Sequence, residues 1–189
     1  SDVCSSDLDD DFAKNSYQFR CKLETSTSVA PSYTNAVTLT VNRVITISNQ
    51  PTNSNPIAPA SASFTVAGST LDSATIGYQW EKSENGDGVN FATIGGANAA
   101  TYTTPATTYD ADYGDYYRCV LSATGASSVT SSTAQSLVQR TISVTSQPTN
   151  VTGAVGGTVS FGVAANTSDN DAGDITFQWQ VRSEEHTSE

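Results

Sequence analysis

The chain has 189 residues, with 19 acidic and 8 basic side chains and a net charge of −11. This balance argues against binding to nucleic acid or to an anionic membrane surface, because both select basic patches. No run of apolar residues approaches the ~18 that a membrane-spanning helix needs. Ser, Thr, Ala, Asn and Gly dominate the composition, and such chains favour strands and turns over helices.

The two ends of the chain have an unusual relation at the level of coding DNA. Residues 1–8 (SDVCSSDL) and residues 182–189 (RSEEHTSE) can be back-translated into strings that are reverse complements of each other. Both strings resemble a sequencing-library adapter read in frame. We therefore expect both ends to be adapter-like artefacts on a fragment of a longer protein, and we leave them out of the fold interpretation. Residues 9–181 then carry 14 acidic and 7 basic side chains, and the only histidine, His186, is excluded.

One unit is repeated along the chain at a period of about 98 residues, which is the signature of a tandem array. Val41-Asn42-Arg43 returns as residues 138–140, and Gln50-Pro51-Thr52-Asn53 returns as residues 147–150. Single positions return in the same way: Phe64 as Phe161, Trp80 as Trp179, and Cys21 as Cys119. The repeat predicts one complete domain flanked by two partial ones.

Residues 9–43 are the C-terminal part of a first domain. Two alternating segments in it predict only the last two strands of a unit: Tyr17, Phe19, Cys21 and Leu23, then Val37, Leu39 and Val41.

Residues 44–140 form the complete domain. Period-2 alternation and turn residues predict short strands in this order: 44–47, 62–66, 76–81, 91–94, 101–104, 117–121 and 133–138. Three prolines in residues 51–59 suit an edge segment, and the Asn-Gly and Asp-Gly pairs within residues 84–88 predict a hairpin turn. Seven or so short strands with regular turns indicate an all-β sandwich.

Residues 141–181 are the N-terminal part of a third domain. Three segments predict its first three strands, around 142–144, 159–163 and 175–181. A half sandwich leaves one apolar face unburied, so we expect neither partial domain to be stable alone.

The alternation also predicts the structural core. Its members share the buried faces of their strands: Phe64, Trp80, Tyr117, Cys119, Phe161 and Trp179. Cys21 and Cys119 occupy equivalent positions of successive domains, which lie far apart, whereas a disulfide needs Cα atoms within about 7 Å. We therefore expect both thiols to be reduced, with Cys119 as a small apolar filler.

Three features together resemble the immunoglobulin-like superfamily, in the form common in bacterial and phage surface proteins. They are the Tyr78-Gln79-Trp80 strand, residues 112–119 (DYGDYYRC), and Gly95-Gly96-Ala97 before residues 101–104. The resemblance implies tandem immunoglobulin-like β-sandwiches with Trp80 as the core tryptophan. It also implies that either Tyr116 or Tyr117 is the corner tyrosine.

The chain departs from the antibody pattern at one pair of positions. Phe64 and Phe161 stand where the resemblance would place the first disulfide cysteine. We therefore expect the inter-sheet disulfide to be absent.

Asp169, Asp171 and Asp174 form the one metal-like cluster of the sequence. Calcium prefers several carboxylate and carbonyl oxygens, so this spacing could place three carboxylates around one ion. The segment lacks the length and terminal Glu of an EF-hand loop, and acidic loops with glycine also make good turns. We favour the turn and keep calcium as the alternative; no other cofactor is expected.

Two tyrosines and three carboxylates near the corner motif complete the candidate sites. Tyr109 and Tyr113 are candidates for a sugar-stacking platform, although tyrosines in such a loop are more often structural. Asp110, Asp112 and Asp115 lie in a turn typical of this fold, and no histidine remains as a general base. We expect no catalytic residues and no enzyme activity.

The sequence favours a non-enzymatic structural or adhesive segment of a bacterial cell-surface or phage virion protein. The alternative is a carbohydrate-binding accessory module of a larger secreted enzyme. Surface glycans or another protein would be met through the loops at 84–90, 109–115 and 166–174. Nucleic acid and membrane are not expected as partners, the location is expected to be extracellular, and the chain is expected to be monomeric.

Overall fold

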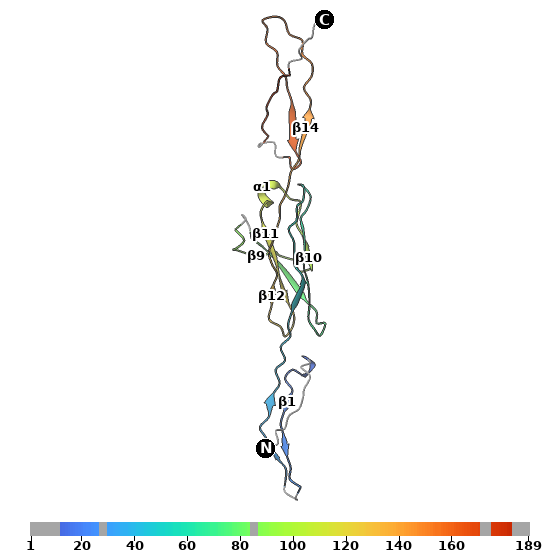
Figure 1. Cartoon of the computed structure of the whole chain (residues 1–189), viewed down its shortest axis with the longest axis vertical. Helices are drawn as coiled ribbons and strands as arrows, with labels where there is room; N and C mark the ends of the chain where they lie inside the picture. The colour runs from blue at the N-terminus through green and yellow to red at the C-terminus, as the bar shows by residue number, and fades with distance from the viewer. Residues whose placement is uncertain (1–11, 27–29, 84–86, 171–174, 183–189) are drawn as a thin grey trace.

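The structure is a computed structural model that describes residues 12–26, 30–83, 87–170 and 175–182. The chain is elongated, and its N-terminal part, middle unit and C-terminal part follow one another along the long axis (Figure 1). Strand β1 lies in the N-terminal part and β14 in the C-terminal part, with most strands gathered between them (Figure 1).

The middle unit has one five-stranded antiparallel sheet on one side of its core and two two-stranded antiparallel sheets on the other. Its elements are β5 (Thr46–Asn49), β6 (Ser63–Thr65), β7 (Ala67–Ser69), β8 (Gly77–Ser83), β9 (Ala92–Thr93), β10 (Thr101–Thr103), α1 (Tyr109–Asp112), β11 (Tyr116–Ser122), β12 (Val129–Thr130) and β13 (Ala134–Gln135). One sheet has the order β12-β11-β8-β9, with β13 also paired to β11. On the other side of the core, β10 pairs with β6 and β5 pairs with β7.

The core lies between the two sheets, where large side chains from β6, β8 and β11 meet. Burial alternates along β11, so that Tyr117, Cys119 and Leu121 point inward. The ring of Phe64 on β6 stacks on Tyr117 at a centroid distance of 4.5 Å and lies 6.3 Å from the ring of Trp80 on β8. The Trp80 indole N–H donates to the carbonyl of Ala99 at 2.9 Å, which satisfies its one polar atom.

This arrangement is an all-β, immunoglobulin-like β-sandwich. Tyr117, rather than Tyr116, is the buried tyrosine of the two corner candidates. Phe64 occupies the core position opposite Trp80, and neither Cys21 nor Cys119 forms a disulfide. Packing of aromatic rings therefore joins the two sheets here without a covalent bridge.

The seven predicted strands of the middle unit are present within a few residues, whereas β7, β12 and the short helix α1 were not predicted. The first strand begins at Thr46 instead of residue 44. The proline segment makes isolated parallel bridges to the residues that follow β13, from Ser54 to Ser136 and from Ile57 to Gln139. The predicted turn at Asn85-Gly86 lies outside the described residues, but Asp87 accepts hydrogen bonds from the side chain of Ser83 and the N–H of Val89 just after it.

The N-terminal part forms two short hairpin-like ladders. Its elements are η1 (Phe12–Lys14), β1 (Gln18–Phe19), β2 (Lys22–Leu23), β3 (Ser32–Tyr33) and β4 (Val37–Thr38). β1 pairs with β4, and β2 pairs with β3, both antiparallel. The first predicted strand is present as β1 and β2 and the second as β4, whereas β3, the partner of β2, was not predicted.

The C-terminal part differs from the sequence expectation. It contains β14 (Ile142–Ser146) paired with β15 (Ala164–Thr167), whereas residues 159–163 and 175–181 form no strands. Their counterparts in the middle unit, β6 and β8, are held by β10 and β11. The described residues of the third unit include no counterparts of β10 and β11, and a strand without a hydrogen-bonding neighbour is not stable.

The same absence corrects the predicted core. Phe161 and Trp179 are 53% and 52% exposed, whereas Phe64 and Trp80 are 1% and 0% exposed. The rings of Phe161 and Trp179 still lie 6.1 Å apart, close to the 6.3 Å between Phe64 and Trp80. Among the described residues of the third unit, these two aromatic side chains are not enclosed as Phe64 and Trp80 are.

Replacing Trp80 with Ala should therefore destabilise the middle unit by about 3–5 kcal/mol, the usual cost of truncating a large buried aromatic side chain. Urea denaturation followed by circular dichroism gives the free energy of unfolding. The matched control is Trp179→Ala, which should change that free energy by no more than about 0.5 kcal/mol, as at exposed positions. Equal losses for the two variants would contradict the burial difference.

Candidate functional site at the joints between units

The predicted metal cluster is only partly within the described residues. Asp171 and Asp174 lie outside them, whereas the Asp169 side chain is largely buried. Its Oδ2 atom accepts a hydrogen bond from the backbone N–H of Tyr109 at 3.3 Å and lies 3.9 Å from Nη1 of Arg140. In the part of the chain that the structure describes, no three His, Cys, Asp or Glu side chains are grouped as metal ligands. Asp169 is thus placed against a cation of the protein itself.

These contacts define a cluster that spans the joint between the middle and third units, and we call it the upper joint. The guanidinium of Arg140 lies 4.5 Å from the ring centroid of Tyr109, and Tyr109 stacks on Tyr113 at 5.0 Å. Arg140 follows the last strand of the middle unit, Tyr109 begins α1, and Asp169 belongs to the third unit. A cation over an aromatic ring and a carboxylate beside it hold the two units together at this point.

The joint below the middle unit uses the same residue types. Arg43, 97 positions before Arg140, binds Asp72, 97 positions before Asp169. The Nε atom of Arg43 lies 3.0 and 2.9 Å from the two carboxylate oxygens of Asp72, and Nη2 lies 2.6 Å from Oδ2. Nη1 also donates to the carbonyl of Thr124. We call this arrangement the lower joint.

The electrostatics of the lower joint follow from this geometry. Hydrogen bonding to Arg43 lowers the pKa of Asp72 to about 2. A carboxyl group with a depressed pKa stabilises the folded form above its unfolded pKa, and the contribution is lost as the pH falls through the folded pKa. The Arg43–Asp72 pair therefore persists throughout the neutral and mildly acidic range.

Sequence reasoning found the repeated arginines but missed their partners. In both joints the aspartate stands 29 positions after the arginine, and this equal spacing was the available signal. The arginine and the aspartate meet only because the turn that carries the aspartate folds back onto the linker. The alternation of apolar residues along a strand does not predict how such a turn folds.

The joint also explains the two candidate platform residues. One face of Tyr109 is covered by Arg140 and the ring is stacked on Tyr113, so Tyr109 is not an open platform. Tyr113 is 53% exposed. Tyr113 is thus the more exposed ring of the pair.

The carboxylates considered for catalysis have structural surroundings. Asp115 is buried, and its Oδ2 lies 2.8 Å from Nζ of Lys82 on β8. Asp112 accepts a hydrogen bond from the N–H of Thr108 at 2.8 Å, at the beginning of α1. These contacts fix the corner loop before β11.

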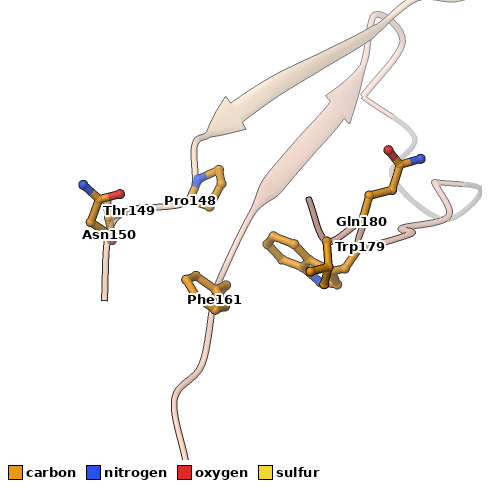
Figure 2. A pocket seen from close by; sticks show the side chains of 7 residues that line it. Pro148, Thr149, Asn150, Phe161, Trp179 and Gln180 are labelled. Atoms are coloured by element: carbon orange, nitrogen blue, oxygen red, sulfur yellow. The ribbon is translucent and has the colours of Figure 1, made fainter. Parts of the chain in front are cut away.

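A hollow with aromatic walls lies in the third unit. Figure 2 shows Phe161 and Trp179 facing a cavity of about 520 Å³ that Pro148 also borders. Its lining is mostly apolar, and its members are Pro148, Thr149, Asn150, Phe161, Trp179, Gln180 and Val181. It coincides with the uncovered half of the third core.

Residues 46–140 match the model of a family described as a domain of unknown function, DUF8696. No curated protein matches the chain. Among solved structures, the chain is similar to "Drosophila OTK, extracellular domains 3-5", with 18% identity and a TM-score of 0.40 over 81% of this chain and 49% of that one. A second is "Crystal structure of DIP-gamma IG1+IG2", with 10% identity and a TM-score of 0.36 over 68% of this chain and 62% of that one. The chain thus spans about half the length of the first structure and less than two thirds of the second.

Within its described residues, no helix has the length and hydropathy needed to cross a membrane.

The thiols of Cys21 and Cys119 should differ sharply in their rates of alkylation. Burial raises the pKa of Cys119 to about 11, and the thiolate is the reactive form, whereas Cys21 is only half-buried. At pH 8, an alkylating reagent should label Cys21 within minutes and Cys119 only after denaturation, as read by peptide mass spectrometry. Cys119→Ser, which removes the buried thiol, is the control for peptide assignment. Rapid labelling of Cys119 in the native protein would contradict its placement.

Proposed function

We propose that the chain, which belongs to the DUF8696 family, is a non-enzymatic segment of an extracellular rod that spaces or presents adhesive domains. In finer terms, we propose a bacterial cell-surface or phage virion protein as its source. The proposal combines the immunoglobulin-like fold with the repeated joints, since a fold by itself supports many functions.

The observation that carries the proposal is the recurrence of an Arg–Asp contact at both joints. Arg43 and Arg140 each occupy the linker, and each meets an aspartate 29 positions later in the following unit. Short linkers alone would leave neighbouring domains free to bend, because relative motion is the default across small interfaces. A guanidinium–carboxylate contact at each linker restricts that motion and keeps successive units extended, as a spacer requires.

The surroundings of the charged residues support a role without catalysis. Arg118 pairs with Glu81 at 2.7 Å, Lys82 with Asp115 at 2.8 Å, and Arg43 with Asp72 at 2.6 Å. The first pair joins two strands, the second joins a strand to a loop, and the third joins a linker to a turn. Charges committed to such contacts stabilise the fold and are poorly placed to act as a general acid or base on a substrate.

A ligand, if one is bound, meets the loops. The exposed ring of Tyr113 at the upper joint is the best-placed aromatic surface of the middle unit. Because Tyr109 is committed to Arg140, a sugar would stack on one ring only, which fits weak polar contact better than a dedicated carbohydrate site.

Replacing Arg140 with Ala should loosen the upper joint and leave the units folded. Small-angle X-ray scattering should then show a smaller mean radius of gyration, because bent conformations shorten an extended rod. Arg118→Ala is the matched control: it also removes a paired arginine, but its partners, Glu81 and Phe91, lie within the middle unit. An unchanged scattering profile for Arg140→Ala would contradict a stiffening role.

Ligand binding is tested separately by calorimetry of the whole chain with calcium and then with a panel of glycans. The spacer role predicts no glycan heat, or weak heat that Tyr113→Ala removes and Tyr33→Ala retains. Tight glycan binding that survives Tyr113→Ala would contradict the proposal and favour a carbohydrate-binding module.

A further inference from the structure

The repeated Gln-Pro-Thr-Asn motif holds the beginning of the middle unit to its end. The side-chain oxygen of Gln50 accepts the backbone N–H of Ser132 at 2.8 Å, and that of Asn53 accepts the backbone N–H of Gln135 at 2.8 Å. Pro51, which lies between the two amides, is buried and has no N–H to donate. The two side chains thus take the place of backbone carbonyls as acceptors for the last segment of the unit.

Backbone hydrogen bonds continue this contact toward the C-terminal end of the unit. They run from the N–H of Ser54 to the carbonyl of Gln135 at 2.9 Å, and at 2.8 Å each from Leu137 to Ser54, from Gln139 to Pro56 and from Ala58 to Gln139. The bridges in this stretch are parallel, and their partners are 82 positions apart, as are the partners of Gln50 and Asn53. A single parallel register therefore joins residues 50–58 to residues 132–139, and we call this contact the terminal clamp.

Buried side chains lie under the terminal clamp. Pro51, Pro56 and Ala58 are buried on one segment, and Ser136 and Val138 are buried on the other. Separation of the segments would expose this surface to water at the same time as it breaks the hydrogen bonds, and both changes are unfavourable.

The direction of the terminal clamp decides how tension along the rod acts on it. The N-terminal part and the C-terminal part lie at opposite ends of the middle unit (Figure 1). Tension therefore pulls residues 50–58 toward one end and residues 132–139 toward the other. Because the two segments are parallel, they would have to slide past each other, and their hydrogen bonds share the load instead of breaking one after another.

Strand β5 precedes the terminal clamp on the same path. It is held to β7 by three residue pairs, with a register shift between Ile47 and Asn49. Tension that strips β5 from β7 next reaches Gln50, where the continuous register of the terminal clamp begins. The terminal clamp is thus the contact that must give way before the sandwich can open.

We propose that the terminal clamp gives the middle unit a mechanical function, which is to stay folded under tension along the rod. This inference rests on the proposed spacer function, because a rod passes tension from one unit to the next through its linkers. The Arg–Asp contacts at the joints orient the units, whereas the terminal clamp sets how long the middle unit resists extension. The return of the motif at residues 147–150 places the same accepting side chains at the start of the third unit.

The test is unfolding of the whole chain at constant force, applied through peptide tags at its two ends. The event to follow is the one that releases the length of residues 46–140, which match one family model. Replacing both Gln50 and Asn53 with Ala should raise the rate of this event roughly tenfold, because two hydrogen bonds that oppose sliding are lost. Asn53→Ala alone should raise the rate about threefold.

Two controls separate the terminal clamp from general stability. Gln79→Ala also removes a glutamine side chain that donates to backbone carbonyls, those of Trp80 and Ile94, but these lie away from the terminal clamp. It should change the rate under force by less than about twofold. The double variant Gln50→Glu and Asn53→Asp keeps both accepting oxygens and should unfold at about the wild-type rate.

The outcomes decide the proposal in the following way. Equal acceleration by Asn53→Ala and Gln79→Ala would overturn it, and so would a wild-type rate under force for the Gln50→Ala and Asn53→Ala double variant. Loss of resistance in the Glu and Asp variant would overturn the role of the accepting oxygens. None of these results changes the scattering expected of Arg140→Ala, which measures bending at a joint without load, so failure of the proposed function is recognised separately.

Discussion

The pairing of β8 with β11 is the interaction on which the rest of the structure depends. Seven consecutive residue pairs join these strands, and they place Trp80 directly opposite Cys119. That contact brings together segments about forty residues apart, and the entropy of closing such a loop must be offset by burial of the side chains that meet. The aromatic set of Phe64, Trp80 and Tyr117 provides this burial, with all three rings nearly inaccessible to solvent.

The same dependence explains what happens at both ends of the chain. Residues 175–181 have the apolar alternation of β8 and yet form no strand, because no described residue of the third unit takes the place of β11 beside them. Trp179 is consequently half exposed at a position where its counterpart is fully buried. A segment therefore forms a strand only when a second segment pairs with it. The local sequence pattern shows that a segment can be a strand but not whether its partner is present.

This difference marks how far sequence reasoning reached. Alternation and repetition predicted the sandwich and the burial of Phe64 and Trp80, because in the middle unit every strand has its partner within the same repeat. The same pattern at Phe161 predicted a core that the third unit does not complete. The contacts at the joints could not be predicted for a related reason. Arg43 and Asp72 meet because a turn folds back, and their spacing of 29 residues corresponds to no strand or helix period. The calcium alternative at Asp169, Asp171 and Asp174 is not tested, because Asp171 and Asp174 lie outside the described residues.

The central claim is that strand pairing is complete in the middle unit and incomplete in the two terminal parts. Hydrogen exchange of a dilute sample, read by mass spectrometry, measures this segment by segment. The account predicts that amides in residues 77–83 and 116–122 exchange at least about a hundredfold more slowly than those in residues 175–182 and 18–23, because only the former are closed into a ladder with a buried face. Equal protection of residues 77–83 and 175–182 in dilute solution would contradict the account.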